Sequence, residues 1–338
     1  MVREAVLLMI KETSKFLLET LGLPKFTDIY EMADEIGLNP SLIYILSINT
    51  NCYYTKFEIP KKDGRVRTIY KPSYSMKMVQ RWILEKILYK FPLTDYSYAF
   101  RKNVSCPLKC NAQMHKENMF IFKMDLKDFF PSISRAKVYY LFIQIGYNSI
   151  IANILTNICT LRDHIPQGAV TSPYLSNLVC RTLDKRIAGY CSRREIVYTR
   201  YADDLTFSSN DKMLLKSIYN TIKKIIENEG YLLNTSKTRL QGPKNKKTIT
   251  GVTVNNGFLK ASKIMKKKVR AMIHRAILSG CYEDIDKIKG YIAYISSIED
   301  DYLGKVKKYI YHFKESPHLT SENISAYNQH KLFSDIEL

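Results

Sequence analysis

Apolar residues recur every three to four positions through the first part of the chain. This spacing is clear in "REAVLLMIKETSKFLLETLG", which ends at Gly22 before Pro24, and in two shorter runs within "FTDIYEMADEIGLNPSLIYIL". It places apolar side chains on one face of a helix, and glycine and proline mark the helix end. We therefore predict that residues 1–48 form a helical region.

Strand-like patterns follow in three places. Residues 53–72 place Asp63-Gly64 between two β-rich arms, which predicts a hairpin. A strand is predicted in "NMFIFKMDLKDFFPSI", which runs into Asp125. A second hairpin is predicted in residues 195–210, "EIVYTRYADDLTFSSN".

The remaining chain alternates helices with loops. Helical spacing predicts helices within residues 135–160, 211–229 and 262–315, whereas residues 97–115 predict a loop. The last twenty or so residues are polar and predict a loosely held tail. Strands and helices interleave without a regular βαβ rhythm, and no glycine fingerprint for nucleotides is present. We therefore predict an α+β fold class.

The charge balance favours a polyanionic partner. The 338 residues include 52 Lys+Arg against 32 Asp+Glu, a formal net charge of +20. Such an excess favours nucleic acid, although a generically basic soluble protein would also show it. No apolar run approaches the ~18 residues that span a bilayer, so we expect no membrane partner and a cytoplasmic location.

Cysteine usage agrees with a reducing compartment. The seven cysteines are odd in number and scattered. Cys106, Cys110 and His115 superficially resemble metal ligands, but no second pair follows at zinc-finger spacing. We therefore do not predict a zinc site.

Asp203 and Asp204 are adjacent within an otherwise apolar hairpin, where burial and mutual repulsion are costly. Because side chains alternate across a strand, a site would need a third acid, and Asp125 is the best candidate. Three carboxylates at strand ends suit two Mg²⁺ ions that catalyse phosphoryl transfer. The alternative is an exposed turn in which the aspartates cap the backbone.

The surrounding motifs resemble reverse transcriptases. The resemblance rests on "YADDLTF", on "MDLKDFFPSI" and on "IPQGAVTSPYLSNL", which occur in the family's order, and it covers most of residues 50–310. It implies an RNA-directed DNA polymerase shaped as a right hand, with fingers, a palm bearing the Tyr-Ala-Asp-Asp hairpin on an antiparallel sheet, and a helical thumb. It also implies the following division: 1–48, N-terminal helical region; 49–120, fingers; 121–255, palm, with part of the fingers inserted near 135–175; 256–315, thumb; 316–338, C-terminal tail.

The resemblance also assigns roles around the three aspartates, which would bind metal and catalyse. Phe130 would be the aromatic gate that selects deoxynucleotides, Gln167 and Gly168 would meet the incoming nucleotide, and Lys237 would protonate pyrophosphate. The alternatives are a core phenylalanine, an ordinary turn and a surface lysine.

The basic hairpin would bind the triphosphate of the dNTP, because the chain has no P-loop. The residues expected to do so are Lys61, Arg65 and Arg67, and Arg67 most of all because "RVRTIYKP" resembles the family's fingers motif. Otherwise the hairpin is a solvated edge blunted by charge.

Two further motifs resemble retron reverse transcriptases. "NAQMH", residues 111–115, is similar to their Asn-Ala-x-x-His signature, and "ITG", residues 249–251, lies where they have Val-Thr-Gly. The resemblance makes four residues candidate RNA contacts: Asn111, His115, Thr250 and Gly251. A capping asparagine, an ordinary histidine and a strand-end glycine are the alternatives.

The expected thumb begins with a basic helix, "LKASKIMKKKVRAMIHRAILSG". Ser262 would be its N-cap, and its apolar residues recur at near-helical spacing. Its cations would bind the backbone of RNA or of an RNA–DNA hybrid: Lys266, Lys267, Lys268 and Arg270. A solvated helix face is the alternative.

The resemblance implies a function in a bacterial cytoplasm. A retron enzyme would use dNTPs and a structured non-coding RNA, as both template and primer, to make branched RNA–DNA (msDNA). It would act in antiphage defence with an effector protein. The alternatives are a reverse transcriptase of a group II intron or a diversity-generating element, and a non-catalytic RNA-binding scaffold.

Overall fold

The computed structural model describes residues 16–60, 64, 66–255 and 257–335, and the chain divides into two compact units. Unit 1 comprises Met1–Lys102, Lys123–Leu205 and Ser217–Thr238. Unit 2 comprises Asn103–Phe122, Thr206–Lys216 and Arg239–Leu338. Two of the places where the chain passes from one unit to the other lie inside strands, β3 (Phe120–Asp125) and β5 (Asp204–Ser209).

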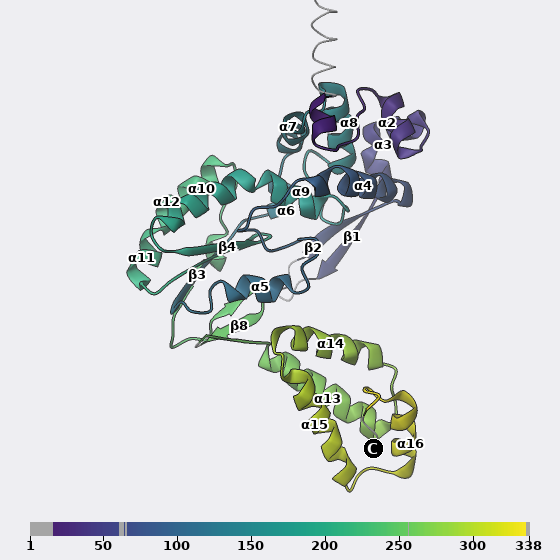
Figure 1. Cartoon of the computed structure of the whole chain (residues 1–338), viewed down its shortest axis with the longest axis vertical. Helices are drawn as coiled ribbons and strands as arrows, with labels where there is room; N and C mark the ends of the chain where they lie inside the picture. Colours follow the sequence, from purple (N-terminus) through teal and green to yellow (C-terminus); the bar gives the residue numbers. More distant parts are fainter. Residues whose placement is uncertain (1–15, 61–63, 65, 256, 336–338) are drawn as a thin grey trace, which may run out of the picture. The chain divides into compact units, whose positions relative to one another are not determined.

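Unit 1 consists mainly of helices (Figure 1). They are α2 (Ile29–Ile36), α3 (Pro40–Ile48), η1 (Thr50–Tyr53), α4 (Tyr74–Lys86), η2 (Leu88–Lys90), α6 (Phe129–Ser132), α7 (Arg135–Ile145), α8 (Ser149–Cys159), α9 (Ser172–Val179), α10 (Arg181–Ser192), α12 (Tyr219–Asn228) and η3 (Thr235–Lys237).

The short N-terminal helices begin at side-chain caps. Asp28 accepts hydrogen bonds from the Tyr30 and Glu31 amides to start α2, and Gly37 ends the helix in the left-handed conformation. Asn39 caps α3 in the same way. The prediction of two short helices is therefore confirmed, whereas most of the longer helix predicted before them lies outside the described residues.

The predicted basic hairpin is confirmed. Strands β1 (Tyr54–Pro60) and β2 (Val66–Pro72) pair antiparallel, with Tyr54 opposite Pro72 and Pro60 opposite Val66. Two of its predicted nucleotide-binding residues, Lys61 and Arg65, lie outside the described residues.

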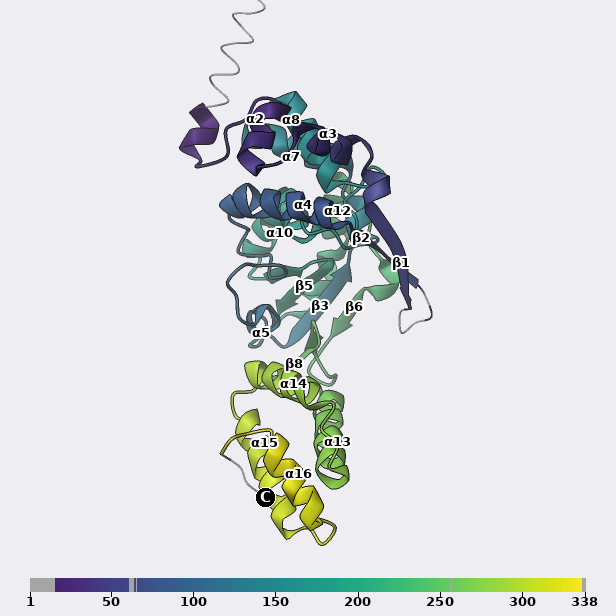
Figure 2. The same cartoon turned by 90° about the vertical axis from the view of Figure 1, so that its right-hand side faces the viewer.

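A four-stranded sheet positions the catalytic candidates. Its order is β4-β5-β3-β6, where β4 is Val197–Tyr201 and β6 is Arg239–Gln241. The hairpin predicted in residues 195–210 is thus present as β4 and β5. Helix α10 packs on β4, and α12 packs on α10 (Figure 2). Helices and an antiparallel hairpin combined in this way confirm the predicted α+β class.

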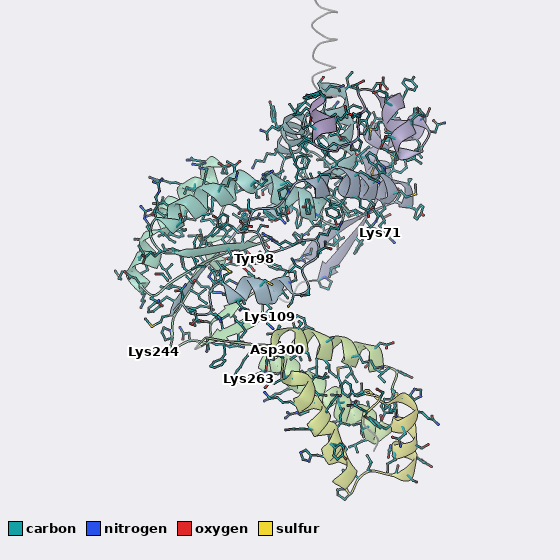
Figure 3. The ribbon with its side chains drawn as sticks, viewed as in Figure 1. Lys71, Tyr98, Lys109, Lys244, Lys263 and Asp300 are labelled. Carbon is teal, nitrogen blue, oxygen red and sulfur yellow. The ribbon has the colours of Figure 1, made fainter. Side chains whose placement is uncertain are left out.

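Unit 2 combines a small antiparallel sheet with helices. Its elements are α5 (Pro107–Gln113), α11 (Lys212–Ser217), β7 (Thr248–Ile249), β8 (Val252–Asn255), β9 (Phe258–Lys260), α13 (Lys263–Ser279), α14 (Ile285–Ile298), α15 (Tyr302–Tyr311), η4 (His312–Glu315) and α16 (Ser321–His330). Helix α5 packs on β8, and one apolar core joins this sheet to the C-terminal helices. Lys109 of α5 pairs with Asp300 at 2.9 Å (Figure 3).

Three local predictions were wrong. The loop predicted over residues 97–115 contains α5, which Pro107 can start because proline fits the first helical turn. The helix predicted over 211–229 is two helices that meet at Ile218. The tail is not loosely held, because α16 buries Tyr327 completely in the core of unit 2.

Across the residues that the structure describes, every helix is too short or too polar to cross a membrane.

Candidate active site

The fold brings Asp125 next to the hairpin turn. Asp125 ends β3, Asp203 lies in the turn between β4 and β5, and Asp204 begins β5. The Leu126 amide donates a hydrogen bond of 2.9 Å to the Asp203 carbonyl, which fixes the end of β3 against the turn. Residues distant in sequence thereby come together, as the motif pattern predicted.

Burial and like charge act together on the aspartates. Asp125 is buried, whereas the Asp204 side chain keeps 35% of its exposure. Burial, and then the charges of Asp125 and Asp204, raise the pKa of Asp203 to about 6. A carboxyl group whose pKa is raised by neighbouring acids is typical of a functional site, and a bound cation would stabilise its charged form.

Lys237 neutralises Asp125 in this structure. Its Nζ lies 2.9 Å from both carboxylate oxygens of Asp125, and Asn234 Nδ2 lies 3.3 Å from one of them. Burial alone would lower the pKa of Lys237, but the hydrogen bond and charge of Asp125 outweigh it and raise that pKa. Lys237 therefore lies at the candidate catalytic aspartates and not on a remote surface.

Sequence reasoning missed two neighbours of these acids. Lys123 lies on β3 two residues before Asp125, with its Nζ 3.9 Å from Asp204 Oδ2 and its side chain only 8% exposed. A lysine inside an apolar strand, at the two-residue period of Asp125, was an available signal. Asn234 had no comparable signal, because only the tertiary fold brings it to Asp125.

The donor set fits a hard divalent cation, since all three candidates offer carboxylate oxygens. Among the described residues, no group of three or more Asp, Glu, His or Cys side chains lies close enough together to bind a metal ion. Asp125 instead accepts both hydrogen bonds from Lys237. The oxygen donors of the site thus fit the metal ions that the sequence predicts. In this structure Lys237 is hydrogen-bonded to one of the three carboxylates, that of Asp125.

The predicted nucleotide-contacting residues that the structure describes lie in unit 1 with the aspartates. Phe130 is half-buried, and its ring centroid lies 5.5 Å from that of Phe129 and 6.3 Å from that of Phe100. Arg67 is exposed on β2 opposite Ile59.

The Pro-Gln-Gly loop is held against β2. The Tyr70 amide donates 2.8 Å to the Gln167 carbonyl. Gly168 has φ +119°, and a Cβ there would lie 2.5 Å from the Tyr70 carbonyl oxygen. Any other residue would therefore push the loop away from the hairpin.

The predicted RNA contacts from the two retron-like motifs differ in exposure. Asn111 and His115 are fully buried, and His115 Nδ1 lies 2.7 Å from Ser208 Oγ. The buried Oγ1 of Thr250 and both amide atoms of Asn111 have no hydrogen-bond partner among the described residues. Gly251 is exposed, with φ +89°. RNA contact by these four residues stays a prediction.

Helix α13 separates the basic residues that its sequence groups together. Lys266 Nζ pairs with Glu299 at 2.8 Å, and Lys268 Nζ lies 3.2 Å from the Tyr291 hydroxyl. Lys267 and Arg270 line a groove of about 650 Å³. Ser262 occupies the N-cap position but makes no side-chain capping hydrogen bond.

Comparisons with known proteins agree with this geometry. A family described as "Reverse transcriptase (RNA-dependent DNA polymerase)" matches residues 59–254. The chain is 35% identical over 302 residues to Retron Ec86 reverse transcriptase of Escherichia coli, covering 87% of this chain and 93% of that protein. It is 34% identical over 281 residues to Retron Ec73 reverse transcriptase of Escherichia coli, covering 77% and 88%.

A solved structure shows the same fold. Apo telomerase from Candida tropicalis matches with a TM-score of 0.50 and 13% identity, covering 82% of this chain and 62% of that chain. The chain therefore spans less than two thirds of the telomerase chain. At this identity the likeness concerns the fold alone.

Proposed function

The chain belongs to the retron reverse transcriptases, which are RNA-directed DNA polymerases, and we propose on this premise that it copies its own non-coding RNA into msDNA. The observation that supports this most is the placement of Asp125 beside Asp203, with the pKa of Asp203 raised to about 6. A buried carboxylate, Asp125, and a partly buried one, Asp203, lie together and need a cation, and polymerisation supplies a use for it.

We propose that Asp125, Asp203 and Asp204 hold the metal. Reverse transcriptases depend on divalent metal ions, and the oxygen donors here suit two Mg²⁺ ions. Bound metal would lower the pKa of the attacking hydroxyl and stabilise the charge that develops on the phosphoryl group. Lys237 would have to release Asp125 when metal binds, and its ammonium would then be free to protonate the pyrophosphate leaving group.

The nucleotide would be selected by residues of unit 1. The Phe130 ring would exclude a ribose 2′-hydroxyl, and the Gln167–Gly168 loop would support the sugar from the side of β2. Arg67 would bind the triphosphate, helped by Lys61 and Arg65, which lie outside the described residues. A cation on an exposed strand can meet a charged ligand without a prior desolvation cost.

We further propose that the RNA is both template and primer, and that the msDNA acts with an effector protein in defence against phage in the bacterial cytoplasm. Support comes from the Asn-Ala-x-x-His element and the Ile249–Gly251 element, which belong to one unit in which α5 packs on β7 and β8. Gly251 and the exposed cations of α13 would provide RNA contacts. Asn111, His115 and Thr250 would contact RNA in conformations that expose their side chains.

The test is to express the protein with the RNA gene that neighbours it and to sequence the copurifying nucleic acid. We expect branched RNA–DNA, and we expect Asp203→Asn with Asp204→Asn to abolish DNA synthesis while RNA binding persists. DNA made only on added, unrelated templates would favour a group II intron or diversity-generating enzyme. RNA binding with no synthesis by the wild type would favour a non-catalytic scaffold.

A further inference from the structure

A fully buried ion pair lies directly behind the catalytic turn. Nε and Nη2 of Arg200, on β4, each donate a 2.7 Å hydrogen bond to the Asp184 carboxylate, on α10. Neither side chain has any exposed surface. Removing two charges from water is costly, and an apolar pair of the same volume is often as stable. Stability alone therefore does not explain why an ion pair lies at this position.

The third nitrogen of Arg200 faces the turn. Its Nη1 donates to the Ala202 carbonyl and to Asn177 Oδ1, at 3.1 Å each. Ala202 immediately precedes Asp203 and has φ +56°, in the left-handed region that residues other than glycine seldom occupy. Such a conformation persists only where the surroundings enforce it. Arg200 thus holds the peptide group that leads into Asp203.

The backbone of Arg200 fixes a second segment of the site. Its amide donates 2.7 Å to the Tyr96 carbonyl, and its carbonyl accepts 2.8 Å from the amide of Tyr98, which Figure 3 labels. The same loop then reaches Phe100, whose ring lies 6.3 Å from the ring of Phe130. One residue is therefore bonded both to the catalytic turn and to the loop that contacts the proposed nucleotide gate.

We propose that Arg200, oriented by Asp184, is a positioning residue for DNA synthesis that sets the place of Asp203 relative to Asp125. This inference rests on the proposed role of Asp203 as a metal ligand. Only arginine suits the position, because its planar guanidinium serves the carboxylate, the amide oxygen and the carbonyl at the same time. A lysine has one nitrogen and cannot reach all three.

The test is Arg200→Lys, which keeps the positive charge but loses the planar guanidinium group and its several hydrogen-bond donors. We expect kcat for DNA synthesis to fall about 10- to 100-fold, the loss typical of small misplacements of catalytic groups. The KM for dNTP and the Kd for RNA should change less than about threefold, because neither ligand touches Arg200. The Mg²⁺ concentration for half-maximal rate should rise.

Tyr198→Phe is the matched control. The Tyr198 hydroxyl donates 2.9 Å to Asp184, so its removal weakens the same buried network without touching the turn. We expect its Tm to fall while kcat, measured well below the Tm, stays within about threefold of wild type. If the kcat losses of the two variants simply follow their Tm losses, the network is structural and the proposal is wrong.

Asn177→Ala keeps the experiment decisive if Arg200→Lys does not fold. It leaves the ion pair intact and removes one acceptor of Nη1, together with the hydrogen bonds that Asn177 makes with Ser97 Oγ and the Ala99 carbonyl. We expect kcat to fall several-fold with KM unchanged, and an unchanged kcat would overturn the proposal. The proposed function is checked separately by wild type and Asp203→Asn. If Asp203→Asn kept wild-type synthesis, the catalytic assignment itself would fail, whatever Arg200→Lys does.

Discussion

At the scale of single residues, Asp203 bears its charge where the fold disfavours it. Its folded pKa of about 6 lies above the ordinary value of 3.8, because burial, Asp125 and Asp204 all oppose ionisation. Well below pH 3.8 the carboxyl is protonated in both the folded and the unfolded chain, so it does not affect stability. Above pH 6 the carboxyl is ionised in both states, but its charge is unfavourable only in the folded state, where burial and the neighbouring acids oppose it. Stability should therefore fall as pH rises through this window.

The prediction compares wild type with Asp203→Asn in a chelator. From pH 4 to pH 8 the difference in free energy of unfolding between the variant and wild type should change by about 2 kcal/mol in favour of the variant, as the shifted pKa of Asp203 implies. Denaturant unfolding at both pH values measures this. Asp34→Asn, an exposed change of the same kind, should show no such gain. An equal response of the two variants would contradict the proposal that the folded state disfavours the charge of Asp203.

Phe130 is the residue on which nucleotide selection should depend. Phe130→Val should raise the kcat/KM for ribonucleotides relative to deoxynucleotides by at least about tenfold, because the clash with the 2′-hydroxyl is relieved. Single-nucleotide incorporation assays measure the ratio. The control is Phe129→Leu at the buried neighbour, which should lower stability and leave the ratio unchanged. If both variants shifted the ratio equally, Phe130 would not be the gate.

At the scale of elements, α13 places neighbouring cations in different surroundings. Lys266 is held by Glu299, which also accepts a 2.7 Å hydrogen bond from the Ala261 amide, whereas Lys267 faces an open groove. Neighbouring lysines of one helix should therefore behave differently.

The matched pair is Lys267→Gln and Lys266→Gln. Lys267→Gln should weaken RNA binding and reduce the slope of log K against log salt by about 0.7–0.9, the effect of one lost phosphate contact. Lys266→Gln should leave that slope unchanged and lower the free energy of unfolding by about 1–3 kcal/mol, because Glu299 loses its partner. Equal slopes for the two variants would reject this division.

Helix α16 contributes to the stability of unit 2 through Tyr327. Tyr327→Ala should cost about 3 kcal/mol of unfolding free energy, as for other large aromatic truncations in a core. Tyr327→Phe is the control, because the buried hydroxyl has no hydrogen-bond partner among the described residues. It should be neutral or stabilising. Thermal unfolding of both variants would show whether the ring is needed, and a large loss for the phenylalanine variant would contradict this account.

At the scale of the whole molecule, the formal net charge of +20 should dominate RNA affinity. Binding that neutralises several phosphates releases their counterions, so affinity should fall at least about 10³-fold between roughly 50 and 200 mM salt. Filter binding of the cognate RNA across this range measures the slope. Asp203→Asn leaves every cation in place and should give the same slope. A slope near zero would mean that the basic excess is not used for RNA.

The class of fold, the hairpin that contains Asp203 and Asp204, and the family could all be predicted from the sequence alone. These follow from local patterns: the apolar strand-like run that ends at Asp125, the Tyr-Ala-Asp-Asp turn and the Asp63-Gly64 hairpin signal. Each depends on residues close together in the chain, so the local backbone preference and the motif agree without help from distant contacts.

The burial and the pairing of the charged and polar side chains, in contrast, depend on the tertiary structure. Nothing local reveals that Lys266 is paired while Lys267 faces a groove, that Asn111 and His115 are buried, or that Arg200 reaches the Ala202 carbonyl. The physical reason is that burial and pairing depend on partners far along the chain, such as Glu299 for Lys266. Sequence spacing does not specify those partners.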